Sequence, residues 1–263
     1  MGCSQQRRKA NCAAAARISR TNAVYGFSKL AWCIIETVAG IHNTQSYEVI
    51  FRIVKRFLFA VTAFCAAAVL TASAVDATTI VDEWSTVQAP AAPTLAAVRV
   101  DPNTTALLVL DLVKETCNDQ VGRCLASIPK VAKLLTGARE SKTTVVYSLI
   151  FGPNTTADVL PGVAPLGSEP VVKGGPDKFI GTDLEKVLRD KGITTVIVVG
   201  TAANGAVLYT ASHAALLGFN VIVPVDGMSA QTPYAEQYVA WNMLHAPIVS
   251  AKVKLSAIDM VTF

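Results

Sequence analysis

The stretch Ile193–Leu217, ITTVIVVGTAANGAVLYTASHAALL, decides the fold of this 263-residue chain. It opens with a continuous β-branched run, Ile193–Val199, which is typical of a strand covered on both faces. A turn of small residues follows over Gly200–Gly205, and the apolar residues after it recur at helical spacing. A strand that leads through such a turn into a helix brings free backbone N–H groups and the positive helix end together. We therefore expect a ligand site at this turn.

Strands and helices alternate over residues 105–263, which predicts a single α/β domain: a three-layer α/β/α, Rossmann-like fold with a doubly wound, mostly parallel sheet. Predicted strands cover residues 105–112, 143–150, 170–173, 193–199, 220–225 and 253–258. Predicted helices cover 127–141, 182–191, 206–217 and 232–245. Ser127 is the expected N-cap of the first of these helices, with Pro129 in its first turn, and Thr232-Pro233 should start the last one.

The N-terminal part of the chain contains an apolar run, FLFAVTAFCAAAVL, at residues 57–70. Lys55 and Arg56 precede it and Ala72-Ser73-Ala74 follows, so the three parts of a secretory signal are present. We predict a signal peptide over residues 54–74 and a periplasmic or secreted protein. An uncleaved leader that anchors the chain in a membrane is the alternative.

Residues 1–53 do not fit in front of a signal peptide. We expect them to be a non-native or disordered extension, with the true start at Val54. Residues 75–104 are rich in Ala, Pro and Thr and are interpreted as a linker or lead-in to the domain at 105–263.

The charge of the chain is uneven, which limits the classes of partner. Residues 1–74 hold nine Lys and Arg against two Asp and Glu, so residues 75–263 carry a formal net charge of −3. This balance gives no support to nucleic-acid binding. We expect a small-molecule substrate, no nucleic-acid partner, and contact with a membrane only through an uncleaved leader. An envelope-anchored interaction protein remains a further alternative.

Two cysteines remain beyond the leader, Cys117 and Cys124 in CNDQVGRC. In an oxidising compartment this spacing favours a disulfide, and two reduced thiols are the alternative. The spacing differs from that of zinc sites and no His lies near it, so these cysteines do not indicate a metal.

Several segments occur in an informative order. LLVLDL contains Asp111, VVKGGPDKF carries Lys173 six residues before Phe179, and VIVVGTAANGAV forms the strand and turn described above. Together with DLEKVLRDKGITTVIVVG and VPVDGMSAQTPYAEQ, they make residues 103–262 resemble the isochorismatase-like hydrolase superfamily, the cysteine hydrolases that include nicotinamidases.

The resemblance implies that Asp111 and Lys173 form the acid–lysine pair of that family. It places the family's nucleophilic cysteine at Ala206, where this chain has no thiol. The Asp-x-His metal motif of nicotinamidases is absent, so the resemblance implies neither a metal nor another cofactor. Isochorismatases proper hydrolyse a vinyl ether without the thiol, with the aspartate as general acid.

The resemblance therefore implies an exported hydrolase that acts on a small, carboxylated molecule through Asp111 without a covalent cysteine intermediate. The alternative is a non-catalytic descendant that binds a small ligand. Candidate substrate-binding residues lie at the ends of predicted elements: Tyr147, Thr201, Asn204 and Gly205. Asn204 has an equal alternative as a turn residue, and His213 is expected to pack rather than act as a base. Relatives are often dimers or larger, so a homo-oligomer is compatible with the resemblance.

Overall fold

The computed structural model describes residues 78–263. The predicted N-terminal extension, the signal peptide and residues 75–77 lie outside the described residues. The chain divides into two units, and the described part of the first contains one short helix, α4 (Ile80–Glu83). The second unit is Gln88–Phe263 and begins before the predicted boundary at residue 105. Among the described residues, no helix combines the length and the apolar character that a membrane span requires.

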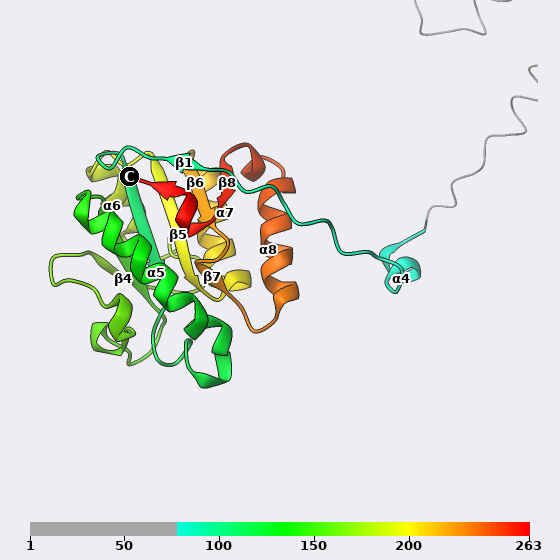
Figure 1. Ribbon diagram of the computed structural model, residues 1–263, viewed down its shortest axis with the longest axis horizontal. Helices are drawn as coiled ribbons and strands as arrows, with labels where there is room; N and C mark the ends of the chain where they lie inside the picture. Colours follow the sequence, from blue (N-terminus) through cyan, green and yellow to red (C-terminus); the bar gives the residue numbers. More distant parts are fainter. Residues whose placement is uncertain (1–77) are drawn as a thin grey trace, which may run out of the picture. The chain divides into compact units, whose positions relative to one another are not determined.

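The second unit is built on a parallel sheet with the strand order β4-β3-β2-β5-β6-β8 (Figure 1). These strands are β2 (Thr105–Leu110), β3 (Thr144–Leu149), β4 (Val171–Lys173), β5 (Thr195–Thr201), β6 (Asn220–Pro224) and β8 (Val253–Ser256), while β7 (Met228–Ser229) pairs with the end of β5. The chain first builds outward from β2 to β4 and then from β5 to β8 on the other side. The predicted doubly wound sheet is confirmed, and its order reverses between β2 and β5.

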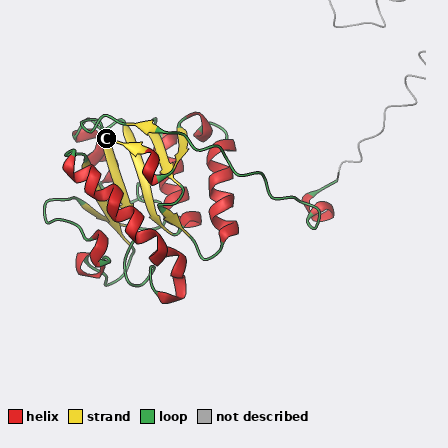
Figure 2. Cartoon of the chain, in the orientation of Figure 1, coloured by secondary structure: helices red, strands yellow, loops and turns green. Residues whose placement is uncertain are grey.

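Helices cover both faces of the sheet, which explains why all six residues of β2 are buried (Figure 2). Successive residues of a strand point to opposite faces. Leu107 and Val109 pack with helix α5 (Gly122–Glu140), whereas Leu108 and Leu110 face the opposite side. That side is covered by α6 (Leu184–Asp190), α7 (Leu208–Leu216) and α8 (Pro233–His245).

The predicted lead-in contributes to the fold before residue 105. Strand β1 (Val98–Arg99) pairs in parallel with β9 (Val261–Thr262) and forms a separate two-stranded sheet. Just before β1, the Ala96 N–H donates a hydrogen bond to the Leu255 carbonyl at 2.9 Å. Residues 96–99 are therefore fastened to the C-terminal part of the domain, and the prediction of a linker up to residue 104 is too long.

Helix α5 starts five residues earlier than predicted. Its first residue is Gly122, so Ser127 lies inside the helix, where it is buried and donates a hydrogen bond to the Cys124 carbonyl. Pro129 lies within the helix as well, where it removes a backbone N–H. The buried apolar stripe that includes Val131 offsets that loss, because most helical stability comes from tertiary packing.

Two local predictions are confirmed. Thr232 caps α8, because its side chain accepts a hydrogen bond from the Ala235 N–H, and Pro233 is the first helical residue. Cys117 and Cys124 form a disulfide with a Cα–Cα distance of 5.3 Å. This bond ties the loop after β2 to the first turn of α5.

The backbones of β2 and β5 approach so closely at Gly200 that only glycine fits at this position. Gly200 has φ +132° and lies opposite Leu110, whose backbone a Cβ at position 200 would overlap. Gly200→Ala should lower the free energy of unfolding by well over about 1 kcal/mol in urea denaturation. Gly122→Ala is the control, because a Cβ there meets nothing within 4 Å. It should be neutral or stabilise by up to about 1 kcal/mol. Similar effects of both substitutions would contradict this account.

Candidate active site

The candidate site lies where the strand order reverses. Asp111 directly follows β2, and a turn that starts with Ala202 directly follows β5. The two strands are neighbours, so their carboxyl ends open at the same edge of the sheet. In doubly wound folds this switch point is where ligands bind.

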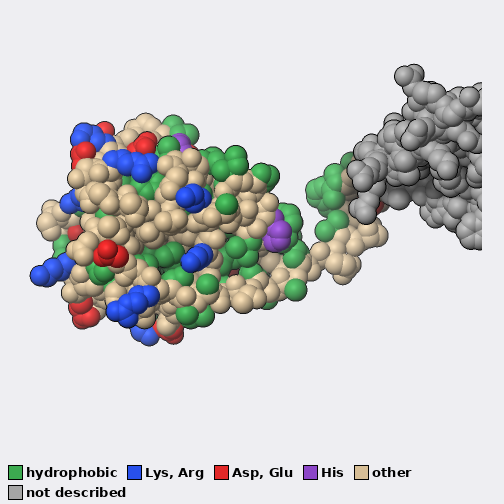
Figure 3. Space-filling view, turned by 90° about the horizontal axis from the view of Figure 1, so that it is seen from above, with side chains coloured by type: hydrophobic (Ala, Val, Ile, Leu, Met, Phe, Trp, Pro, Cys, Tyr) green, Lys and Arg blue, Asp and Glu red, His purple; other side chains and the backbone are tan. Residues whose placement is uncertain are grey.

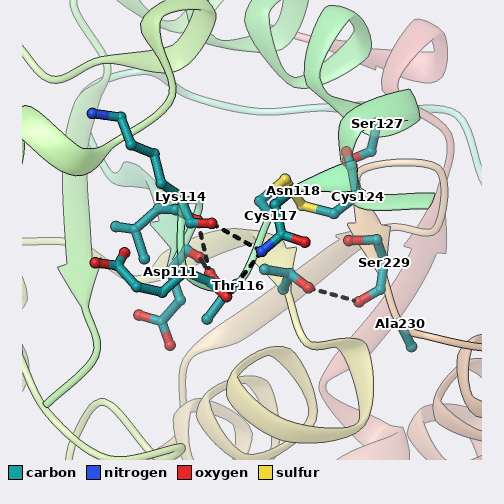
Figure 4. Close-up of a disulfide and its surroundings, with 12 residues drawn as sticks. Asp111, Lys114, Thr116, Cys117, Asn118, Cys124, Ser127, Ser229 and Ala230 are labelled. Carbon is teal, nitrogen blue, oxygen red and sulfur yellow. Dashed lines mark hydrogen bonds between the residues drawn. A yellow bond between two sulfur atoms is a disulfide. The ribbon is translucent and has the colours of Figure 1, made fainter. Parts of the chain in front are cut away.

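The backbone of Asp111 is held in an uncommon conformation with φ +53°. Asp is one of the few residue types besides Gly that adopt this region with some frequency. The Asp111 N–H donates to the Ser148 carbonyl at 3.2 Å, and the Asp111 carbonyl accepts a hydrogen bond from the Thr116 hydroxyl. Figure 4 shows Thr116 between Asp111 and the disulfide of Cys117. The turn after β2 therefore fixes the direction in which the Asp111 side chain points.

The Asp111 carboxyl group is buried and has two side-chain donors. Its Oδ1 accepts a hydrogen bond from Ser148 Oγ at 2.7 Å. Its Oδ2 lies 2.7 Å from Lys178 Nζ, and the side chains of Lys178 and Asp111 are 0% and 5% exposed. A second Lys178 N–H donates to the Gly174 carbonyl at 3.1 Å. Asp111 and Lys178 thus form a buried, hydrogen-bonded ion pair.

Two opposing effects act on this carboxyl group. Burial raises the pKa of Asp111 above its ordinary value, because the charged form loses its hydration. The Lys178 ammonium, by its charge and its hydrogen bond, and the Ser148 hydroxyl lower the pKa, but burial is the larger effect. The carboxyl group therefore retains a proton to higher pH than an exposed aspartate.

The predicted pairing of Asp111 with Lys173 is wrong. Lys173 is exposed at the end of β4, and its Nζ donates to the Asn154 carbonyl at 2.7 Å. The physical reason is the strand order, because β3 separates β4 from β2. The chain turns back after β4, and this brings Lys178 rather than Lys173 to the carboxyl group.

The turn after β5 places the other predicted residues. It begins with a cis peptide bond between Thr201 and Ala202 and continues as a π-helical turn, Ala203–Val207, into α7. The Thr201 hydroxyl donates to the Ser229 carbonyl, and the Gly205 N–H donates to the Ala202 carbonyl, so both groups already have partners within the chain. Asn204 is exposed and Ala206 is buried.

No side-chain nucleophile stands at Ala206. Both cysteines in the part of the chain that the structure describes are joined to each other in the disulfide. Residues 78–263 also contain no group of three or more His, Cys, Asp or Glu side chains placed to hold a metal ion. The chemistry that this site offers rests on the carboxyl group, the ammonium and the hydroxyl around Asp111.

Tyr147 lies on the other face of the sheet from Ser148. The register pairs Val109 with Tyr147 and Leu110 with Ser148, so the tyrosine faces α5. Its hydroxyl donates to the Val163 carbonyl at 2.9 Å, and burial raises the pKa of that hydroxyl. Tyr147 thus supports the fold, and its predicted place at the substrate is wrong.

Comparison with known proteins gives one family over most of this unit. Residues 105–252 match the isochorismatase domain family. An uncharacterised isochorismatase family protein, YecD of Escherichia coli O157:H7, is 45% identical over 60 residues. That stretch covers 23% of this chain and 31% of YecD, so the chain matches about a third of the length of this relative.

Solved structures share the fold. An isochorismatase family protein from Desulfovibrio vulgaris has a TM-score of 0.54 and 21% identity, over 60% of this chain and 95% of its own. A cysteine hydrolase from Pseudomonas syringae pv. phaseolicola has a TM-score of 0.55 and 20% identity, over 64% of this chain and 95% of its own. At these identities the similarity establishes the fold alone.

The buried ion pair predicts a non-additive mutant series. Asp111→Asn leaves the Lys178 ammonium buried without a counter-charge and should cost about 3–5 kcal/mol of unfolding free energy. Asp111→Asn combined with Lys178→Met should recover most of that loss, because neutral replacements of a buried pair are often tolerated. Lys173→Met, at an exposed position, should change stability by less than about 0.5 kcal/mol. Urea denaturation measures these three variants and Lys178→Met alone, and additive effects of the two site substitutions would refute the pair.

Proposed function

Since the chain belongs to the isochorismatase family, we propose that it is a hydrolase that acts on a small, carboxylated molecule through Asp111 as general acid. The observation that carries this proposal is the buried Asp111 carboxyl group at the switch point of the sheet. Burial raises the pKa of Asp111, which is the direction that a general acid requires. The proton would go to the terminal alkene carbon of an enol ether substrate, which leaves an oxocarbenium ion.

Lys178 has a complementary role in this proposal. An ammonium group has three N–H donors, and within the described structure two of them are directed at Asp111 and Gly174. Because the Lys178 side chain is fully buried, its role in this proposal is to hold and orient the acid rather than to contact the substrate.

Water is the proposed nucleophile. Ala206 has no reactive side chain, and the described cysteines are held in the disulfide. Protonation of the terminal alkene carbon of an enol ether generates an oxocarbenium ion. Water adds to the oxocarbenium carbon and loses a proton, and the resulting hemiketal collapses to a carbonyl product and a free alcohol, so no covalent enzyme intermediate is needed. Hydrolysis of an enol ether or a related carbon–oxygen bond fits this division of roles.

Ligand binding without turnover is the second candidate function. The observation that favours it is the complete burial of Lys178 in its contacts with Asp111 and Gly174. A pair that is satisfied within the chain can serve binding and positioning without proton transfer. Saturable binding of small carboxylates with no product formed would favour this candidate over the hydrolase.

Export is also part of the proposal. The disulfide between Cys117 and Cys124 supports an oxidising compartment, where such bonds persist. Figure 3 shows Lys and Arg side chains scattered over the visible face of the domain rather than gathered in one patch. This distribution agrees with a small-molecule substrate rather than a nucleic acid.

Activity should depend on both members of the pair. In a screen of vinyl ethers and small carboxylated substrates, Asp111→Asn and Lys178→Met should each lower kcat/KM by at least about 10²-fold. Activity should fall as pH rises through the pKa of Asp111, because the acid must carry its proton. Lys130→Met, on the exposed side of α5, is the matched lysine control and should leave turnover unchanged.

The same series separates the two lysines. If Lys173→Met abolishes turnover while Lys178→Met does not, the assignment of Lys178 is wrong. Turnover that survives Asp111→Asn would exclude the acid mechanism itself.

Export predicts a defined product. When the gene is expressed in a Gram-negative host, the protein should be recovered outside the cytoplasm with its N-terminus at Val75 and with Cys117 and Cys124 oxidised. Terminal sequencing and intact mass with and without reduction measure both properties. A cytoplasmic product that retains residues 1–53 would contradict the proposed leader.

A further inference from the structure

The segment Pro176–Phe179, which carries Lys178, is fastened to helix α7 through consecutive residues. Thr210 on α7 is fully buried, and its Oγ accepts a hydrogen bond from the Lys178 N–H at 3.2 Å. The same hydroxyl donates to the Pro176 carbonyl at 3.4 Å. One hydroxyl therefore bridges the backbone on both sides of Asp177.

The side chains on either side of Lys178 also contact α7. Asp177 Oδ2 lies 2.8 Å from His213 Nδ1, and the two side chains are 19% and 32% exposed. The Phe179 ring packs against the His213 ring, with centroids 5.1 Å apart. Backbone and side-chain contacts thus hold this segment to one helix while the Lys178 side chain extends to Asp111.

The segment lacks regular secondary structure of its own. It lies between β4 and α6, and glycines flank it at Gly174, Gly175 and Gly181. Gly181 has φ +70°, which is costly for most other residues. The position of the Lys178 backbone therefore depends on its anchors rather than on a strand or helix around it.

The helix that anchors this segment also continues from the turn after β5. Thr210 follows Ala206 by four residues, which is about one helical turn. α7 and the π-helical turn before it therefore determine two sides of the site, the turn at Ala206 and the backbone of Lys178. A shift of this helix would move both together.

We propose that Thr210 and His213 are positioning residues, which hold the Lys178 ammonium against Asp111 by fixing the segment Pro176–Phe179 to α7. This inference rests on the proposed function, because it assigns these residues to the same acid–lysine pair. It gives His213 a role through Asp177 and Phe179, and not as a base that contacts the substrate.

The titration of Asp111 tests the inference without a substrate. In the full chain with ¹³C-labelled aspartate, the Asp111 carboxyl signal is assigned by its loss in Asp111→Asn and followed by NMR against pH. Lys178→Met should move the midpoint to higher pH, because the ammonium that stabilises the carboxylate is gone. Thr210→Val, which keeps the shape and removes both hydrogen bonds, should move it in the same direction.

Rescue and control variants separate positioning from general damage. Thr210→Ser should restore the wild-type midpoint, because it restores the hydroxyl. Thr143→Val removes another buried threonine hydroxyl, just before β3, and should leave the midpoint unchanged. His213→Ala removes a partly exposed side chain and should raise the midpoint even if Thr210→Val fails to fold.

The outcomes also separate this inference from the proposed function. A wild-type midpoint in Thr210→Val and His213→Ala would overturn the positioning role, whatever the activity of the protein. If these variants shift the midpoint of the Asp111 titration but the wild-type protein has no hydrolytic turnover, the positioning role is supported and the proposed hydrolase function is not.

Discussion

Two opposite charges remain buried at the switch point because each is the counter-charge of the other. Removing either ion from water costs several kcal/mol, and their attraction offsets this only when the geometry is good and the remaining donors are satisfied. Ser148 supplies a second donor to Asp111, and the Gly174 carbonyl accepts from Lys178. The turn after β2, the close approach at Gly200 and the anchoring of Lys178 to α7 together maintain that geometry.

The parts of the fold that local patterns determine could be predicted from the sequence. The β-branched run before Gly200 is a buried strand, because both faces of a central parallel strand are covered. Thr232 and Pro233 start α8 because a cap and a fixed φ act within one turn of the chain. The short spacing of Cys117 and Cys124 favours a disulfide in the same way. Each of these predictions could be made from a local sequence pattern.

The site was predicted only in part, because the order of the strands in the sheet decides which of its other residues come together. The position of Asp111 at the end of a buried strand could be predicted from the sequence, but the identity of the lysine that pairs with it could not. Lys173 and Lys178 are five residues apart, and the path of the loop after β4 decides which one reaches β2. Ser148 had a usable signal, because it alternates with Tyr147 on one strand and only one of them can face the site. To predict which of the two side chains faces the site, one needs the register between β3 and β2.

A buried ion pair is weak support for stability, because well-packed apolar residues of similar volume often serve as well or better. This pair occupies the position where doubly wound folds bind ligands, and it keeps a carboxyl group with a raised pKa at that point. Among the described residues the two cysteines are joined in a disulfide, and the site contains an acid, an ammonium that reaches the acid, and a helix whose contacts hold the backbone of Lys178. These parts suit proton transfer to a bound molecule followed by attack of water. In the mechanism that we propose, the chemistry depends on the protonation state of Asp111, and our further proposal is that this state depends on where α7 holds Lys178.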